Sequence, residues 1–158
     1  MISTSIFALL ATVALALSPM GSTPTNPDDA NMQARVDTVL AANPGGEQTA
    51  WNVVSWDDGA VVLTLAPENS VGSLTVGGCA TGKHCAYNGV SYTGDKLTYS
   101  TCTSHESVSA LPGTVRSMAN SRSSGSIKAY SSSSTLLATA TAGHGTNVGG
   151  TTSYISCS

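Results

Sequence analysis

The residues of this chain that could do chemistry are four cysteines, three histidines and a small set of carboxylates. Cys79, Cys85 and Cys102 lie close together in the sequence, and Cys157 lies near its end. No pair has the Cys-x2-Cys spacing typical of zinc sites, so we expect no metal. Four cysteines in an exported chain pair most simply as two disulfides, in one of three connectivities. Gly82 permits a tight return between Cys79 and Cys85, which favours that pair and leaves Cys102–Cys157 as the second.

No catalytic pattern emerges from the other reactive residues. His84, His105 and His144 have no spacing that demands a shared zinc ion, and surface or turn positions are favoured for them. Asp95 and Glu106 are the only carboxylates after residue 68, and we expect both to be solvated. Gly-x-Ser-x-Gly, a phosphate loop and a dinucleotide fingerprint are all missing. The sequence therefore favours a binding or inhibitory protein without a cofactor over an enzyme.

Charge is sparse and unevenly placed. Charged residues make up 9% of the 158 residues, against about 25% in typical domains. The formal net charge of -3 does not suggest nucleic acid or an anionic membrane as a partner. Residues 28–68 carry seven acids and one base, whereas residues 79–158 carry two acids and five bases. This split is either chance or a sign that the two segments attract each other.

Residues 1–22 resemble a secretory signal peptide. The apolar stretch from Ile6 to Leu17 is too short to span a bilayer, and Ala14-Leu15-Ala16 offers a cleavage site of small residues. Residues 23–28 follow as a flexible spacer. We expect a secreted, extracellular protein that leaves the membrane after cleavage; an uncleaved anchor is the alternative.

Residues 29–67 are expected to form an acidic module of one helix and one β-hairpin. Apolar residues share one helical face, and the segment Asn43-Pro44-Gly45-Gly46 ends the helix. Strands are expected at residues 51–56 and 60–66, joined by a turn at Asp57-Asp58-Gly59. Such a module is too small to be stable alone, so we expect it to dock on the β region that begins after the connection at 68–78. The apolar helical positions are Met32, Val36, Val39 and Leu40.

Residues 79–158 show only β signals, so the fold class is mainly β. Cys85-Ala86-Tyr87 is echoed by Lys128-Ala129-Tyr130, 43 residues later. Val115-Arg116-Ser117-Met118 is echoed by Thr151-Thr152-Ser153-Tyr154, 36 residues later. This repetition predicts two Greek-key motifs packed as a pair of sheets. The strands are expected at 83–87, 95–100, 115–120, 126–130, 136–141, 146–149 and 153–157.

Two stretches of this region resemble a known family. The segment Cys79-Ala-Thr-Gly-Lys-His-Cys85-Ala-Tyr87 resembles the opening Cys-x5-Cys-x-Tyr segment of the Streptomyces metalloproteinase inhibitor family. The segment Val115-Arg-Ser-Met-Ala-Asn120 resembles a second signature of that family. The family is similar to βγ-crystallins, so the resemblance implies a βγ-crystallin-like sandwich. It also implies a structural corner made of Tyr87, Tyr92, Gly94 and Ser117.

The resemblance further implies a secreted inhibitor of extracellular proteases, with metalloproteases favoured. The candidate inhibitory loop is Ser109-Ala110-Leu111-Pro112-Gly113-Thr114, where proline restricts the backbone, and Ser131–Thr135 is a second candidate. Calcium binding is not expected, because residues 112–117 contain no acid. We expect a monomer whose partner is a protease. The alternative is a non-catalytic binding or toxin-like protein that acts on a cell envelope or a polysaccharide.

Overall fold

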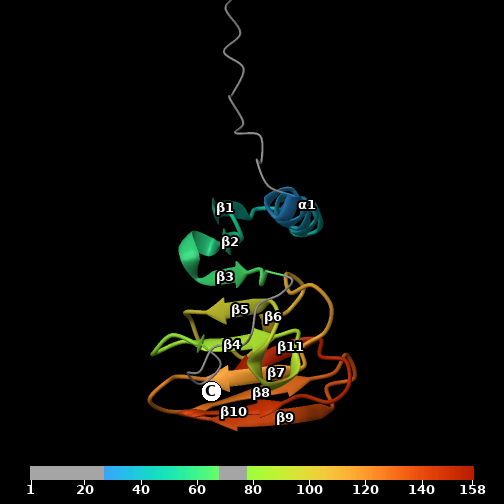
Figure 1. The fold of residues 1–158 in the computed structure, drawn as a ribbon. Helices are drawn as coiled ribbons and strands as arrows, with labels where there is room; N and C mark the ends of the chain where they lie inside the picture. Colours follow the sequence, from blue (N-terminus) through green and yellow to red (C-terminus); the bar gives the residue numbers. More distant parts are fainter. Residues whose placement is uncertain (1–26, 68–77) are drawn as a thin grey trace, which may run out of the picture.

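A computed structural model describes residues 27–67 and 78–158 (Figure 1). The expected signal peptide at 1–22, and nearly all of the spacer at 23–28 and of the connection at 68–78, lie outside the described residues. Among the described residues, no helix is long and apolar enough to cross a membrane.

The helix α1 (Pro27–Ala42) forms where the sequence predicts it. Proline suits the first helical position, and the acidic side chains of the first turn favour the positive end of the helix dipole. Gly45, with φ of 86°, follows the helix in a left-handed conformation that glycine adopts without strain. The face that is buried consists of Met32, Val36 and Val39.

The hairpin has one strand more than expected. Strands β2 (Val53–Trp56) and β3 (Val61–Thr64) pair around the turn η1 (Asp57–Gly59), which confirms the predicted hairpin. Strand β1 (Glu47–Ala50) pairs with β2 and was not predicted. Its side chains are mostly exposed, so it lacks the alternation that marks a half-buried strand.

The larger sheet has seven antiparallel strands in the order β1-β2-β3-β5-β4-β7-β10. Strand β3 pairs with β5, so the hairpin does dock on the rest of the chain, as an extension of its sheet. Figure 1 shows these strands following one another from the helix to the far end. The remaining members are β4 (His84–Tyr87), β5 (Lys96–Tyr99), β7 (Ser117–Asn120) and β10 (His144–Asn147).

The smaller sheet has four antiparallel strands in the order β6-β11-β8-β9. Its members are β6 (Glu106–Ser107), β8 (Ser126–Tyr130), β9 (Leu136–Thr141) and β11 (Tyr154–Cys157). Strand β6 was not predicted, and β10 begins two residues before the strand expected at 146–149. The two halves exchange strands, since β6 lies in the sheet of the second half and β10 lies in the sheet of the first.

Strand pairing corrects the internal repeat by one residue. Tyr87 pairs with Ser117 in the first half, and Tyr130 pairs with Tyr154 in the second. Ser117 therefore corresponds to Tyr154, 37 residues later, and not to Ser153. The sequence echo, which aligns Ser117 with Ser153, is one residue away from the equivalence set by strand pairing.

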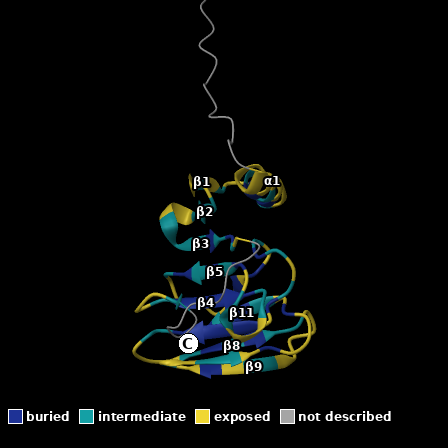
Figure 2. Cartoon of the chain, viewed as in Figure 1, coloured by how far each residue is buried: buried dark blue, intermediate teal, exposed yellow. Residues whose placement is uncertain are grey.

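One apolar row runs across five strands of the larger sheet. Register places Val54, Leu63, Leu97, Ala86 and Met118 side by side, all fully buried. The buried face of α1 and the inner face of the smaller sheet belong to the same core cluster. The helix, the hairpin and both sheets therefore share one core, which is visible as the dark interior in Figure 2.

Both predicted disulfides are present. Cys79 pairs with Cys85 beside strand β4, and Cys102 pairs with Cys157 in the last strand. The second pair closes a loop of 55 residues and joins the first half to the second. Disulfides of this kind are typical of proteins made in an oxidising compartment.

Candidate functional site

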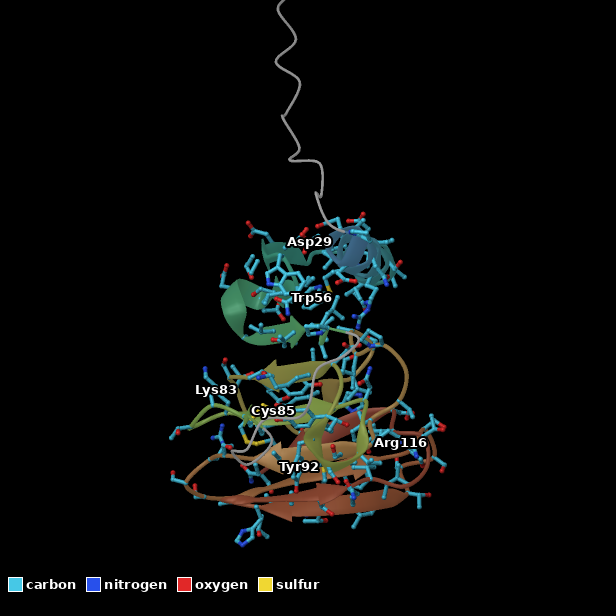
Figure 3. All side chains as sticks on the ribbon, in the orientation of Figure 1. Asp29, Trp56, Lys83, Cys85, Tyr92 and Arg116 are labelled. Atoms are coloured by element: carbon cyan, nitrogen blue, oxygen red, sulfur yellow. A yellow bond between two sulfur atoms is a disulfide. The ribbon has the colours of Figure 1, made fainter. Side chains whose placement is uncertain are left out.

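The predicted structural corner comes together at the end of strand β4. Ser117 accepts a hydrogen bond from the backbone N–H of Tyr92 at 2.9 Å and donates one to the carbonyl of Gly89 at 2.7 Å. The rings of Tyr87 and Tyr92 meet edge to face, with 5.8 Å between their centroids. Tyr92 lies beside the Cys85 disulfide in Figure 3. The backbone of residues 88–95 is thus held by contacts on both sides.

Gly94 is required at this corner by geometry. Its φ of 78° lies in the left-handed region, and a Cβ there would clash with Oδ1 of Asn88. That oxygen accepts the N–H of Asp95 at 2.8 Å, so it cannot move aside without losing a hydrogen bond.

Asp95 is a buried anchor and not the solvated carboxylate expected from the sequence. It is 4% exposed, and its Oδ1 accepts hydrogen bonds from Arg35 at 2.6 Å and from the N–H of Ala66 at 2.8 Å. Its Oδ2 accepts the side-chain amide of Asn88 at 2.9 Å. The anchor therefore ties the helix and the end of the hairpin to the corner.

In this ion pair the acidic segment, residues 28–68, supplies the positive charge, and the basic segment, residues 79–158, supplies the negative one. Arg35 is the single base of residues 28–68, and Asp95 is one of the two acids of residues 79–158. A specific, half-buried contact between minority charges joins the two segments here. The overall charge of each segment does not describe this contact.

Glu106 and His84 form a second buried pair that the sequence did not indicate. His84 is fully buried, where a surface or turn position was favoured, and its Nε2 is hydrogen-bonded to Oε2 of Glu106 at 2.5 Å. The His84 ring stacks on Tyr99. The pKa of Tyr99 is raised above its usual range, mainly by burial and to a smaller extent by the neighbouring Glu106 charge.

His105 and His144 are exposed, as expected. A usable signal for the burial of His84 was the alternation of the strand, because His84 lies on the same face of β4 as Ala86, which belongs to the main core.

No metal site emerges from these groups. Within residues 27–67 and 78–158, no cluster of three or more histidine, cysteine, aspartate or glutamate side chains could hold an ion. The described carboxylates nearest to the β core are instead used to hold other protein groups.

The candidate inhibitory loop Ser109–Thr114 is packed against the protein. Leu111 is 3% exposed and belongs to the main core, and its N–H donates to the carbonyl of Val108. The carbonyl of Pro112 accepts the side-chain amide of Asn88 at 2.9 Å. Residues of this loop and of α1 line the same shallow groove. The largest apolar side chain of the loop is therefore not available to an enzyme.

The second candidate loop, Ser131–Thr135, projects from the smaller sheet between β8 and β9. Its backbone is closed by two hydrogen bonds, from Ser131 N–H to the Thr135 carbonyl and from Ser134 N–H to the Ser131 carbonyl, each 3.0 Å long. Ser133 Oγ lies 2.9 Å from Ser131 Oγ and 3.1 Å from the Thr135 hydroxyl. All residues from 132 to 136 are exposed. The loop is thus held in one conformation by its own hydroxyl groups.

Leu136 follows this loop and is half exposed, at 51%. Few large apolar side chains of the described residues are so exposed; the others are Trp51 and Val90. Ser134 has φ of 58°, in the left-handed region, which sharpens the turn before Leu136. The arrangement presents an apolar side chain next to a rigid, polar loop.

Comparison of the chain with protein-family models, curated proteins and solved structures finds no match.

Proposed function

We propose that this chain is a secreted inhibitor of extracellular proteases, metalloproteases above all, and that it presents the loop Ser131–Thr135 and Leu136 to the enzyme. The observation that carries the proposal is the combination of a loop braced by its own hydrogen bonds with an exposed apolar side chain. The loop Ser109–Thr114 supports the same function less well, because Leu111 is buried.

The arrangement of strands supports the family resemblance behind this proposal. In each half, three strands lie in one sheet and one crosses to the other sheet. This exchange is the pattern expected for two paired Greek keys in a βγ-crystallin-like sandwich. The corner made by Tyr87, Tyr92, Gly94 and Ser117 supports the same assignment.

A braced loop favours inhibition for two physical reasons. It loses little conformational entropy on binding, so more of the contact energy appears as affinity. If the enzyme cuts one peptide bond, the remaining hydrogen bonds keep both new ends in place. The open position on a catalytic zinc takes water or substrate, so an oxygen atom of the bound loop would occupy it.

The test is a titration of the oxidised protein against a thermolysin-like and a subtilisin-like protease. We expect stronger inhibition of the first. Leu136→Ala should weaken inhibition about tenfold, since it removes a buried apolar anchor from the complex. Val90→Ala is the matched control, because Val90 is equally exposed but lies in the corner loop.

Two outcomes would overturn the proposal. Failure of the unmodified protein to inhibit either enzyme would remove the function for these protease classes. If Leu136→Ala and Val90→Ala weakened inhibition equally, the assignment of Ser131–Leu136 as the inhibitory loop would be wrong.

A further inference from the structure

A pocket of about 540 Å³ lies where the helix, the hairpin and the segment after β5 meet. Its walls include Trp56 from β2, Tyr99 from β5 and Glu106 from β6, together with the end of α1. Figure 3 shows Trp56 extending from the hairpin on the side of the helix. This volume lies within the range of small-molecule sites, which is about 300–1,000 Å³.

Aromatic rings form part of the pocket wall and continue beyond it. Trp56 is fixed by a hydrogen bond from its Nε1–H to the carbonyl of Asn43 at 3.1 Å. His105 lines the pocket and stacks on Tyr154, with 4.1 Å between ring centroids, and Tyr154 stacks on Tyr130. The pocket therefore opens toward a row of half-exposed rings on the smaller sheet.

Two carboxylates belong to the pocket wall, Glu106, which is 6% exposed, and Asp57. Glu106 is held in place by His84 and by the N–H of Thr103, which donates to Oε1 at 3.0 Å. A carboxylate has about four acceptor positions, so Glu106 keeps acceptor capacity for a ligand. Asp57 is exposed at the wall of the pocket. No lysine or arginine is among the described residues that line the pocket.

The rest of the lining is rich in hydroxyl groups. These groups can donate to or accept from a polyhydroxylated ligand. They come from Thr101, Thr103, Ser107 and Ser109.

We propose that this pocket binds a short oligosaccharide of amino sugars with free amines. The rings would pack against the apolar faces of the sugar, the hydroxyl side chains would pair with sugar hydroxyls, and Glu106 and Asp57 would pair with the ammonium groups. Phosphorylated or carboxylated ligands fit less well, because no cationic side chain is available among the described lining residues to pair with them. The residues that line the pocket include none of Ser131–Leu136, so the two proposals can fail independently.

The probe is the disaccharide of two β-1,4-linked glucosamine units, titrated into the oxidised protein. Trp51→Phe leaves Trp56 as the only tryptophan, so fluorescence then reports on the pocket. The N-acetylated disaccharide has the same ring shape without the charges, and the dipeptide of two lysines has the charges without the ring. We expect the amine disaccharide to bind at least about tenfold more tightly than either.

Variants with matched controls place the ligand in the pocket. Asp57→Asn should weaken binding roughly threefold, as expected for an exposed charge pair. Asp58→Asn removes the same charge from the neighbouring residue, which does not line this pocket, and should leave binding unchanged. His105→Gln should weaken binding, whereas His144→Gln, at the other exposed histidine, should not.

The competing outcomes are distinct. Equal binding of the N-acetylated disaccharide would show that the carboxylates do not select the ligand and would overturn the assignment of an amino sugar. Equal binding of the lysine dipeptide would overturn it in favour of a peptide site. Absence of any change in Trp56 fluorescence and in binding heat would remove the site, with no bearing on protease inhibition.

Discussion

Two loops at equivalent positions of the internal repeat are held in opposite ways. Residues 88–95 connect β4 to β5 in the first half, and Ser131–Thr135 connects β8 to β9 in the second. The first loop is tied to distant groups, namely Arg35, Ala66 and Ser117. The second is tied mainly to itself through its own hydroxyls and backbone. A loop that uses distant partners is fastened to the rest of the protein, whereas one that uses local partners stays free to meet another molecule.

The N-terminal module accounts for much of this difference. It reaches the first loop through Arg35 and the end of β3, and α1 lines a groove together with the loop Ser109–Thr114. If the module were a pro-region that is removed after export, the rest of the chain would be expected to form a complete domain without it. The strands of this module instead extend the larger sheet and its helix contributes to the main core, so a chain starting at Gly77 should be much less stable.

Among single substitutions, the largest expected effect comes from Asp95→Ala, which breaks the anchor of the first loop. The change leaves Arg35, the N–H of Ala66 and the amide of Asn88 without their acceptor. We expect a loss of about 3 kcal/mol in the free energy of unfolding, measured by urea denaturation. Asp29→Ala, at an exposed site in α1, is the control and should cost less than about 1 kcal/mol. Similar losses in both variants would mean that the first loop does not depend on distant partners.

The second prediction concerns Tyr87 and Tyr99, the buried tyrosines of the first half; Tyr87 directly precedes the first loop. The pKa of Tyr87 is raised mainly by burial and to a smaller extent by the neighbouring Tyr92, and burial is also the main cause of the raised pKa of Tyr99. The pKa of each of these tyrosines in the folded protein lies above the unfolded value of 10.0. Their contribution to the free energy of unfolding is therefore complete below pH 10 and is lost as the pH rises further. Stability should therefore fall above pH 10, by up to about 1.4 kcal/mol per group and pH unit.

Urea midpoints between pH 8 and about pH 11.5 would check this sign. Tyr87→Phe should flatten the alkaline loss. Tyr130→Phe, at the equivalent position of the second half, keeps both buried tyrosines and should retain the loss. Stability that rises above pH 10 would contradict the prediction.

A smaller effect is expected from Ser117→Ala. The hydroxyl of Ser117 makes two hydrogen bonds to the corner, so its removal should cost about 1–2 kcal/mol in thermal or urea unfolding. Ser153→Ala is the control suggested by the sequence echo, and it should be nearly neutral because Ser153 is exposed and not equivalent. If Ser153→Ala lowered the free energy of unfolding as much as Ser117→Ala, Ser153 would be the equivalent of Ser117, as the sequence echo suggests, and the equivalence from strand pairing would be wrong.

The smallest effect on stability is expected from Ser133→Ala in the second loop. Its hydroxyl contacts only exposed or half-exposed neighbours, so the free energy of unfolding should change by less than about 0.5 kcal/mol. Cleavage of the loop by the target protease should nevertheless become faster, as followed by mass spectrometry. Unchanged cleavage would show that the hydroxyl bridge does not brace the loop.

Local patterns were enough to predict most strands, the helix, the hairpin turn and both disulfides. Strand β8 and strand β9 begin and end where alternation and turn residues place them. Strands β1 and β6 were not predicted, because β1 is largely exposed and shows no alternation, and β6 has only two residues.

The polar groups of the interior could not be found in this way. Asp95 meets Arg35 across 60 residues, and His84 meets Glu106 across 22. A lone carboxylate in a lightly charged sequence is expected to be solvated, because its partner is set by the fold. The burial of Leu111 was missed for the same reason, since it depends on where the core of α1 and the sheets lies.

The position of strand β11 has a consequence for the order of events during synthesis. This strand, at residues 154–157, lies between β6 and β8 and is not at an edge of its sheet. A chain made from its N-terminus cannot complete the smaller sheet, or pair Cys102 with Cys157, until residue 157 has emerged. Until then β6 has no partner in this sheet and β8 is paired only on its β9 side, and such unpaired strand edges are prone to aggregate. Folding of this chain should therefore finish only after residue 157 has emerged.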